Sequence, residues 1–507
     1  MRTTLLALSA CGVLSCGPAA PKPFPDGFLF GASIAGFQVD MGCPTMPAAQ
    51  CEDRANDWYQ LITSRAQVNP AVAAHFTWDP PSSGPGHWEL FEQDYTRAKD
   101  ELGLSGMRVS IEWSRIFPSA TDNLEGAQLA AVANADAIAR YHAMFASLKA
   151  KGIKPLVTLN HYTLPLWIHD GMACHQNLAT CTNRGWLDKA RLHKEIAKFS
   201  GFVAKEFGAE VDLWATLNEP FAVVIPGFLQ PGKDRVNPPA VSLRFEEARQ
   251  VAIAMIEGHA RMYDAVKAND TADADGNGKA SEIGIVYPIA PTRPKDPQRA
   301  LDKKGADNVF YLYNQLFLDG VLKGLMDENI DGKADGPPRD DLVDRCDWLG
   351  INYYSRATVV GTEAASFPQF SPISTFDPFS LELWEDAPQG IYDAITWAKT
   401  RYGKPIYITE TGTDGAPDSE RIASWLVRYL TMTQKAIHDG ADVRGFFYWS
   451  LIDNYEWNHG MAMRFGLYAV ANDAQKTRTA RSAVGIYRQI TKAVDIPAAV
   501  KQQYPVQ

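Results

Sequence analysis

The sequence predicts an α/β fold: a single (β/α)8 TIM barrel with long loops after its strands. Eight runs of strand length, rich in apolar and β-branched residues, follow one another from residue 28 onward, and segments with helical spacing separate them. Runs that are apolar on both faces suit a parallel sheet covered by helices. Right-handed crossovers close such a sheet most simply into a barrel. An open doubly wound sheet is the alternative, although no glycine-rich phosphate turn follows the first run.

The predicted strands and helices alternate along the chain. In order, the strands are FLFGAS (28–33), GMRVSIEW (106–113), KPLVTLN (154–160), VDLWATLN (211–218), IGIVYPI (283–289), DWLGINYY (347–354), PIYITE (405–410) and RGFFYWSL (444–451). Four intervening segments have helical spacing and end at a glycine, namely 132–152, 189–208, 386–403 and 420–440. A glycine just past a helix, with a strand soon after it, is typical of the turn between a helix and the next strand.

Outside the barrel, assigned to residues 26–492, we predict an export signal over 1–15, a tether over 16–25 and a tail over 493–507. Arg2 precedes a short apolar stretch and then small residues and cysteines, as in export signals. LSAC, ending at Cys11, and VLSC, ending at Cys16, both resemble a bacterial lipoprotein processing box. Cys16 is the better candidate, because a cut before Cys11 leaves a very short signal. We therefore expect an exported protein, lipid-anchored in the cell envelope at Cys16. An ordinary cleaved signal and a misread start are the alternatives.

Composition excludes some classes of partner. The 507 residues carry a net charge of −10 with a pI near 5.5, which argues against nucleic acid because phosphates demand a basic face. No segment after the N-terminus approaches the roughly 20 apolar residues that span a bilayer, so membrane contact is expected only through the lipid anchor. The sequence leaves the oligomeric state open.

The cysteines after the N-terminal segment predict two disulfides. Cys43 and Cys51 are close together, as are Cys174 and Cys181, in loop-like stretches rich in glycine, asparagine and proline. Export permits such bridges. Cys346, just before a predicted strand, is expected to be a buried free thiol. No cysteine or histidine cluster has metal-ligand spacing.

Two predicted strands end in a carboxylate. Glu219 follows the fourth strand, and Glu410 ends the seventh. A barrel brings the carboxyl ends of all its strands to one rim, where chemistry takes place. A facing pair of carboxyl groups, one protonated and one ionised, is the device that hydrolyses glycosidic bonds. Taken singly, either glutamate is equally well explained as a solvated loop residue or a salt-bridge partner.

The end of the fourth strand must be irregular. Successive side chains on a regular strand point to opposite faces, so Asn218 and Glu219 could not both point inward. Pro220 lacks an N–H group and is suited to ending the ladder of backbone hydrogen bonds.

The chain resembles glycoside hydrolase family 1, the β-glucosidase and β-galactosidase type of enzyme, from residue 24 to about residue 490. The motifs that carry this resemblance are FPDGFLFGAS (24–33), GFQVD (36–40), MRVSIEWSRIFP (107–118), LNHYTLPLW (159–167), TLNEP (216–220), LGINYYS (349–355), ITETG (408–412) and YWSLIDNYEWNHGMAMRFGL (448–467). The stretch LNHYTLPLWIHD is most similar to the archaeal-type branch of the family.

The resemblance implies a role for each matching residue. Glu219 matches the acid/base and Glu410 the nucleophile, with Arg108 and Tyr354 beside that nucleophile. Asn218 matches the residue that contacts the sugar 2-hydroxyl. The remaining matches are Gln38, His161, Trp449 and Glu456, which bind the non-reducing sugar, and Trp457 and Asn352, which line the site.

The expected activity is a retaining β-glycosidase that removes terminal glucosyl, galactosyl or fucosyl residues from small carbohydrates, with no cofactor needed for the chemistry. An endo-acting β-glucanase and a catalytically silent sugar-binding relative are the alternatives. Thr411 and Asp40 depart from the usual family pattern. Met463 stands where members acting on phospho-sugars carry lysine, so a 6-phosphoglycoside is not the expected substrate.

Two acidic segments resemble calcium loops. DADGNG (273–278) offers oxygen ligands at Asp273, Asp275 and Asn277, and DENIDG (327–332) offers them at Asp327, Asn329 and Asp331. Both lack the terminal glutamate of such loops, since Gly284 and Pro338 occupy that position. Structural calcium and simple polar turns are both compatible with these segments.

Overall fold

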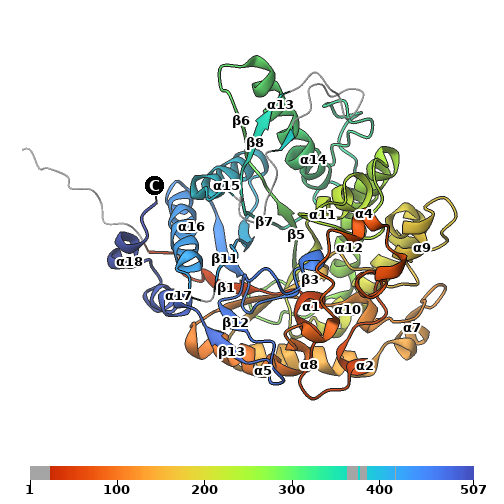
Figure 1. Cartoon of the computed structure of the whole chain (residues 1–507), viewed down its shortest axis with the longest axis horizontal. Helices are drawn as coiled ribbons and strands as arrows, with labels where there is room; N and C mark the ends of the chain where they lie inside the picture. The colour runs from red at the N-terminus through yellow and green to blue at the C-terminus, as the bar shows by residue number, and fades with distance from the viewer. Residues whose placement is uncertain (1–22, 362–374, 377–384, 417, 507) are drawn as a thin grey trace, which may run out of the picture.

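The centre of the molecule is a closed parallel barrel of eight strands, seen in a computed structural model that describes residues 23–361, 375–376, 385–416 and 418–506 (Figure 1). Its strands are β1 (Leu29–Ser33), β2 (Gly106–Ser110), β3 (Lys154–Asn160), β4 (Leu213–Asn218), β5 (Glu282–Pro288), β7 (Trp348–Asn352), β10 (Ile406–Glu410) and β11 (Val443–Trp449). Each of the eight predicted runs forms one of these strands, and each strand pairs with its neighbours in chain order. The predicted (β/α)8 fold is confirmed.

Side chains fill the inside of the barrel. A buried cluster there is formed by Leu156, Leu213, Ala215, Val286, Trp348, Tyr407 and Phe447. Two glycines make room for the largest ring from β11: a Cβ on Gly31 or Gly106 would lie 2.4 Å or 2.9 Å from an atom of Phe447. The barrel is therefore a packed core rather than a pore, and only its rim is available for binding.

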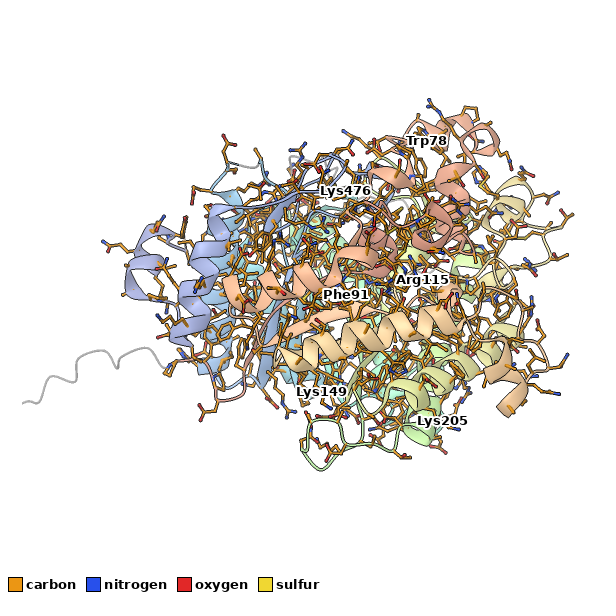
Figure 2. All side chains as sticks on the ribbon, turned by 90° about the horizontal axis from the view of Figure 1, so that it is seen from below. Trp78, Phe91, Arg115, Lys149, Lys205 and Lys476 are labelled. Atoms are coloured by element: carbon orange, nitrogen blue, oxygen red, sulfur yellow. A yellow bond between two sulfur atoms is a disulfide. The ribbon has the colours of Figure 1, made fainter. Side chains whose placement is uncertain are left out.

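Helices surround the barrel and bury their apolar faces against it (Figure 1). The long ones are α8 (Ala135–Ala150), α10 (Lys189–Phe207), α12 (Phe245–Asn269), α15 (Pro388–Tyr402), α16 (Arg421–His438) and α17 (Ser482–Ala493). The four predicted helical segments correspond to α8, α10, α15 and α16; α10 is one residue shorter than predicted, and the other three are shorter by several residues. Exposed lysines such as Lys149 and Lys205 lie on the outer faces of α8 and α10 (Figure 2).

The connections carry further short elements. The other α-helices of the described residues are α1 (Gly36–Asp40), α2 (Ala48–Cys51), α3 (Asp57–Thr63), α4 (Pro70–Ala73), α5 (His87–Thr96), α6 (Trp113–Ile116), α7 (Gly126–Val132), α9 (Gly171–Gln176), α11 (Phe221–Val224), α13 (Ala300–Phe310), α14 (Leu316–Lys323) and α18 (Ala498–Gln503). β6 (Thr292–Pro294), β8 (Ala357–Val360) and β9 (Thr375–Phe376) form one small sheet, and β12 (Tyr468–Val470) pairs with β13 (Arg478–Ala480).

The folded domain extends beyond the predicted boundaries of 26 and 492. Phe24 is buried, packs against Phe28 with ring centroids 4.6 Å apart, and donates its N–H to Val494 O. Helix α18 packs against α16, and Val500 on this helix and Tyr504 just after it are buried. The predicted tail therefore belongs to the barrel domain, because its apolar side chains find burial there.

The predicted export signal and most of the tether, residues 1–22, lie outside the described residues. Among the helices of the described ranges, none has the length and apolar character needed to cross a bilayer.

The cysteines pair as expected. Cys43 is bonded to Cys51 and Cys174 to Cys181, while Cys346 is a buried free thiol. Both disulfides tie loops that follow the carboxyl ends of barrel strands, β1 and β3, and so restrain the rim.

Candidate active site

The two strand-end glutamates lie at the same rim of the barrel. Glu410 is the last residue of β10, and Glu219 follows the last residue of β4. Both side chains are almost completely buried, with 4% and 8% of their surface exposed. A buried carboxylate must be paired or hydrogen-bonded, so the partners of each glutamate define what it can do.

Glu410 is held by a cation and a phenol. The guanidinium of Arg108, on β2, forms a buried ion pair with Glu410 Oε1, and the hydroxyl of Tyr354, just past β7, donates to Glu410 Oε2 at 2.7 Å. Burial raises the pKa of Glu410 above its usual range, and negative charge on Glu219 adds to that effect. Arg108 and the Tyr354 hydroxyl oppose it, because both stabilise the ionised form.

Within the described part of the chain, the side chains that donate to Glu219 are neutral. Asn352 Nδ2 donates to Glu219 Oε1 at 2.8 Å, and the hydroxyl of Tyr162 donates to Glu219 Oε2 at 2.6 Å. The pairing of β4 with β5 slips between Ala215 and Asn218, and Glu219 has a positive φ of 42°. This is the irregular strand end that the sequence demands, and it lets Asn218 and Glu219 both face the site.

A chain of hydrogen bonds links the two glutamates. Arg108 Nη2 donates to Asn218 Oδ1 at 2.8 Å, in addition to the pair with Glu410. Asn352 Nδ2 lies 3.1 Å from the same oxygen and also reaches Glu219. Asn218 and Asn352 thus bridge the ends of β4 and β7 and fix the two carboxyl groups relative to each other.

Glu456, in the loop after β11, anchors a second polar group at the rim. Gln38 of α1 donates its Nε2 to Glu456 Oε2 at 3.0 Å, and Asn454 Nδ2 donates to the same oxygen at 2.6 Å. Arg235 Nη2 donates to Glu456 Oε1 at 3.2 Å. Burial raises the pKa of Glu456, and the charge of Arg235 opposes that rise.

Three buried polar atoms around these carboxyl groups have no hydrogen-bond partner among the described residues. They are Gln38 Oε1, His161 Nδ1 and Arg235 Nη1. An unsatisfied buried polar group costs about 1–3 kcal/mol, so a cluster of them marks the place where a polar ligand, such as a sugar with several hydroxyls, would be received.

His161 is a neutral donor in this cluster. Burial, together with the nearby charges of Arg108 and Arg235, lowers the pKa of His161 well below its ordinary value. Its Nε2 accepts from Asn218 Nδ2 at 3.1 Å, which places the proton on the unpartnered Nδ1. His161 can therefore donate a hydrogen bond to a hydroxyl of a bound sugar.

Aromatic rings frame the polar groups. His161 stacks with Trp449 and with Trp457, at centroid distances of 5.9 Å and 6.1 Å. Trp457 is buried and also stacks on Phe37, at 5.8 Å. Trp449 packs with Met463 in a small apolar cluster. Met463 is the position at which phospho-sugar enzymes carry lysine, and here its side chain makes apolar contacts.

Backbone strain is concentrated at this rim. Tyr162, Glu219 and Trp457 all have positive φ, at 73°, 42° and 52°, a region that disfavours residues with a Cβ. Each such residue costs on the order of 1–3 kcal/mol and persists only where the surroundings impose it. The surrounding packing therefore fixes the directions of these three side chains, which an unstrained backbone would not give.

In the first predicted calcium loop, groups of the protein itself bind the carboxylates. Asp273 accepts backbone N–H bonds from Gly276, Asn277 and Gly278, and Asp275 pairs with Lys154. Oxygens of Asp212, Asp273 and Asp275 all lie within 4.8 Å of one another.

The second loop behaves in the same way. Asp327 accepts from the backbone of Asp331 and Gly332 and from the hydroxyl of Tyr311, and Asn329 donates to Asp335. Hydrogen bonds of this kind are those of polar turns, and the same oxygens remain able to bind a cation, so both interpretations of the two loops stay predictions.

Comparison with known proteins identifies the family. The profile of glycosyl hydrolase family 1 matches residues 20–495. The chain belongs to this family. A β-galactosidase of Pyrococcus woesei is 34% identical, with 95% of this chain and 99% of that protein covered. The crystal structure of the β-glycosidase from Thermosphaera aggregans has a TM-score of 0.81 at 27% identity, covering 96% and 100% of the two chains. The β-glucosidase of Pyrococcus furiosus has a TM-score of 0.79 at 28% identity, covering 96% and 99%.

Family 1 membership makes the chain a glycoside hydrolase acting on small carbohydrate substrates, and such enzymes need no cofactor for catalysis. The structure brings together all eleven residues that the sequence pointed to, at one rim of this family 1 barrel: Gln38, Arg108, His161, Asn218, Glu219, Asn352, Tyr354, Glu410, Trp449, Glu456 and Trp457.

Sequence reasoning missed three polar residues of the site. Tyr162 lies inside the motif LNHYTLPLW, next to His161, but nothing in the motif indicates that its hydroxyl reaches Glu219. Asn454 lies two positions before Glu456 and could have been noticed there. Arg235 belongs to a loop after β4 that matches none of the motifs, so no sequence signal pointed to it.

Proposed function

We propose that this family 1 hydrolase is a retaining, exo-acting β-glycosidase. It removes a terminal non-reducing β-D-glucosyl residue, or the related galactosyl or fucosyl residue, from short oligosaccharides or simple glycosides. One observation carries the proposal: two buried carboxyl groups at one rim, joined by a hydrogen-bonded chain but with different partners. Glycoside hydrolysis uses a pair of carboxyl groups with different roles, and the resemblance to family 1 supports the retaining, double-displacement form of that chemistry.

In the first step, Glu219 is the acid and Glu410 is the nucleophile. Arg108 brings a positive charge directly onto Glu410, whereas the side chains of the described residues that donate to Glu219, Asn352 and Tyr162, are neutral. The cation beside Glu410 favours its ionised form, which is the form that a nucleophile needs. Glu410 attacks the anomeric carbon while Glu219 gives its proton to the departing oxygen, so that a covalent glycosyl-enzyme forms and the alcohol leaves.

In the second step, Glu219 is a base. Its carboxylate takes a proton from water, the hydroxide oxygen bonds to the anomeric carbon, and the bond to Glu410 breaks. The sugar leaves with the anomeric configuration it had in the substrate, because two inversions have taken place.

The residues around Glu456 support exo action. Gln38 Oε1 and His161 Nδ1 are unpartnered among the described residues and buried beside Glu456 and Trp449. They suit the hydroxyls of one sugar ring, with the indole against its apolar face. A relative named β-galactosidase is 34% identical to this chain, and relatives named 6-phospho-β-galactosidase are 27–28% identical. The greater similarity to the first supports a neutral hexose as glycone. An endo-acting glucanase would instead need an open cleft at this wall.

Trapping with a fluorosugar tests the mechanism. A 2,4-dinitrophenyl 2-deoxy-2-fluoro-β-glycoside should inactivate the enzyme with release of one dinitrophenol per chain, and peptide mass mapping should find the sugar on Glu410. Glu410→Gln should release no dinitrophenol and acquire no label. The label on another residue, or a first-formed product of opposite anomeric configuration, would rule out this mechanism. Binding of sugars without turnover by the wild type would favour the silent relative.

We further propose that the enzyme is exported and lipid-anchored at Cys16. The two disulfides of the described region fit an oxidising compartment. Metabolic labelling with a radioactive fatty acid tests the anchor: label is expected on the wild-type protein and on Cys11→Ala, and not on Cys16→Ala. Label lost only in Cys11→Ala would move the anchor to that residue, and unlabelled wild type would leave an ordinary cleaved signal.

A further inference from the structure

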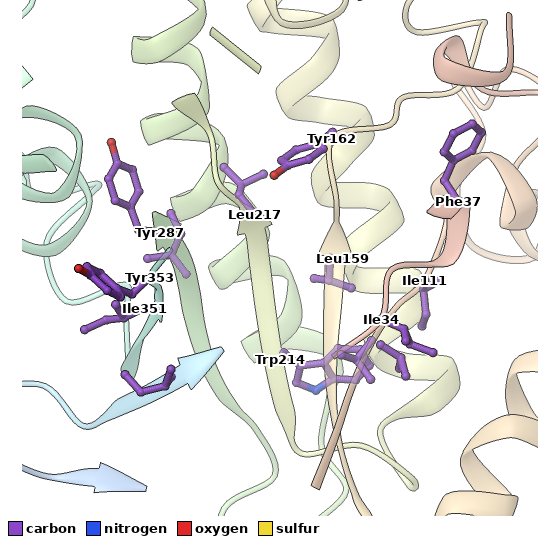
Figure 3. Close-up of a cluster of buried hydrophobic side chains, with 14 of the residues drawn as sticks. Ile34, Phe37, Ile111, Leu159, Tyr162, Trp214, Leu217, Tyr287, Ile351 and Tyr353 are labelled. Atoms are coloured by element: carbon purple, nitrogen blue, oxygen red, sulfur yellow. The ribbon is translucent and has the colours of Figure 1, made fainter. Parts of the chain in front are cut away.

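The residue at the centre of this inference is Tyr162, the second residue after β3. Figure 3 shows Tyr162 beyond the end of its strand, with its hydroxyl turned toward Leu217 on the neighbouring strand β4. Glu219 follows two residues after Leu217, and the Tyr162 hydroxyl donates to its Oε2 at 2.6 Å. Glu219 thus receives a phenol on one carboxyl oxygen and the amide of Asn352 on the other.

Several contacts hold the Tyr162 ring in this place. It packs against Trp457 and His161, with centroids 4.9 Å and 4.8 Å away, and the guanidinium of Arg235 lies 5.9 Å from its centroid. Its φ of 73° is unfavourable for a tyrosine, so the turn itself must be fixed.

The turn is fixed on both sides of the ring. Asn160 Nδ2 donates to Thr163 O at 2.9 Å, and the Thr163 hydroxyl donates to the buried Glu112 at 2.5 Å. Leu164 N–H donates to Asp57 at 3.0 Å. These bonds orient the hydroxyl of Tyr162 before any substrate arrives, which is the preorganisation that a proton-transfer group needs.

We propose that Tyr162 is the positioning residue for the acid/base, tuning Glu219 through its hydroxyl without itself touching the reacting atoms. This inference rests on the proposed roles of Glu219 and Glu410. When Glu219 gives up its proton, the phenol hydrogen bond stabilises the carboxylate that forms, and with Asn352 it fixes the plane of the carboxyl group. Burial and the charge of Glu219 keep the phenol protonated, by raising the pKa of Tyr162 well above its ordinary value.

Tyr162 and Tyr354 donate their hydroxyl hydrogen bonds to different glutamates. Tyr354 donates to Glu410, on the nucleophile side. Tyr162 donates to Glu219, on the leaving-group side. A substitution at Tyr162 should therefore affect only steps that need proton transfer. Cleavage of a 2,4-dinitrophenyl glycoside needs no proton, because dinitrophenolate leaves readily as an anion, whereas cleavage of a methyl or phenyl glycoside does need one.

The test compares Tyr162→Phe with the wild type on both kinds of substrate, using the glycone that the wild type cleaves fastest. Phenylalanine keeps the ring contacts and removes only the hydroxyl. For the phenyl glycoside, kcat/KM should fall by about 10-fold or more, the effect expected of one hydrogen bond to a charged group.

For the dinitrophenyl glycoside, kcat/KM should stay within about 2-fold of the wild type, as expected when no proton transfer is needed. Its kcat and KM should fall together, because base-assisted release of the glycosyl-enzyme slows and the intermediate accumulates. A purely structural role would lower kcat/KM for both substrates and could not produce this split.

Tyr487→Phe is the matched control. Tyr487 is also a buried phenol, but its hydroxyl donates to Gly31 O at 2.8 Å on the barrel wall, away from the site. Tyr487→Phe should lower Tm, because a buried hydrogen bond is lost. It should leave the ratio of kcat/KM between the two substrates unchanged. Equal losses on both substrates in Tyr162→Phe, or no loss on the phenyl glycoside, would overturn the inference. A wild type that cleaves neither substrate would instead refute the proposed function.

Discussion

Tyr354→Phe offers the most direct measurement of how the protein controls the nucleophile. The substitution removes one hydroxyl, which donates to Glu410 Oε2 at 2.7 Å, and keeps the ring and its edge contact with Phe465 at 6.5 Å. The ionised form of Glu410 loses a donor, while Arg108 still holds the other oxygen. The pKa of Glu410, already raised by burial, must rise further.

The expected rise in the pKa of Glu410 follows from the strength of the lost hydrogen bond. A hydrogen bond to a charged group contributes roughly 1.5–3 kcal/mol, and a pKa change of 1 corresponds to about 1.4 kcal/mol. The pKa of Glu410 in Tyr354→Phe should therefore be higher than in the wild type by about 1 to 2. Only the ionised carboxylate attacks, so each tenfold loss of that form at a given acidic pH lowers the activity there by about 10-fold.

The assay is the pH dependence of kcat/KM on a 2,4-dinitrophenyl β-glycoside. This substrate needs no proton from Glu219, so the acidic limb reports the ionisation of Glu410 in the free enzyme. In Tyr354→Phe that limb should move to higher pH, while the rate at the alkaline plateau changes less. Tyr487→Phe should leave the limb in place.

An acidic limb that is unchanged in Tyr354→Phe, or that moves to lower pH, would refute the expected rise in the pKa of Glu410. It would mean that the hydroxyl of Tyr354 does not stabilise charge on Glu410, and that Arg108 alone sets its ionisation. A limb that moves equally in Tyr162→Phe would show that the two phenols do not act on separate carboxyl groups.

Three further predictions concern binding, stability and metal. Arg235→Gln should raise KM and lower kcat/KM by about 10-fold on neutral glycosides, because the cation that opposes the raised pKa of Glu456 is lost; an unchanged KM would contradict this. Glu112 is buried, and burial raises its pKa to about 7. The protonated carboxyl group stabilises the fold fully below the unfolded-state pKa of about 4.5, and this stabilisation is lost as the pH rises through 7. The free energy of unfolding that is lost in this way amounts to at most about 3 kcal/mol. Thermal unfolding of Glu112→Gln should therefore lose less stability between pH 5 and pH 8 than the wild type, and equal losses would argue against a buried charge. A chelator should leave Tm unchanged, since backbone N–H groups already bind Asp273, and a Tm that rises with added calcium would show otherwise.

Much of the fold was predictable because its signals are local. Each of the eight barrel strands came from a run of apolar residues, and the glycines after the helices at 152, 403 and 440 all take positive φ, as an L residue rarely does. The domain boundaries were less predictable. Phe24 donates its N–H to Val494 O near the other end of the chain, and Val500 is buried on α18, which packs against α16. Local sequence patterns do not indicate such long-range contacts.

By itself, the sequence determined the barrel, the two glutamates at its strand ends and the irregular backbone at Asn218. These depend on periodicity and on the alternation of side chains along a strand, which are properties of neighbouring residues. Tertiary structure alone decided that Tyr162 binds Glu219 and that Arg235 binds Glu456. Both contacts join loops from different strands, and the direction of a side chain on a loop depends on the packing of the whole rim rather than on its neighbours in sequence.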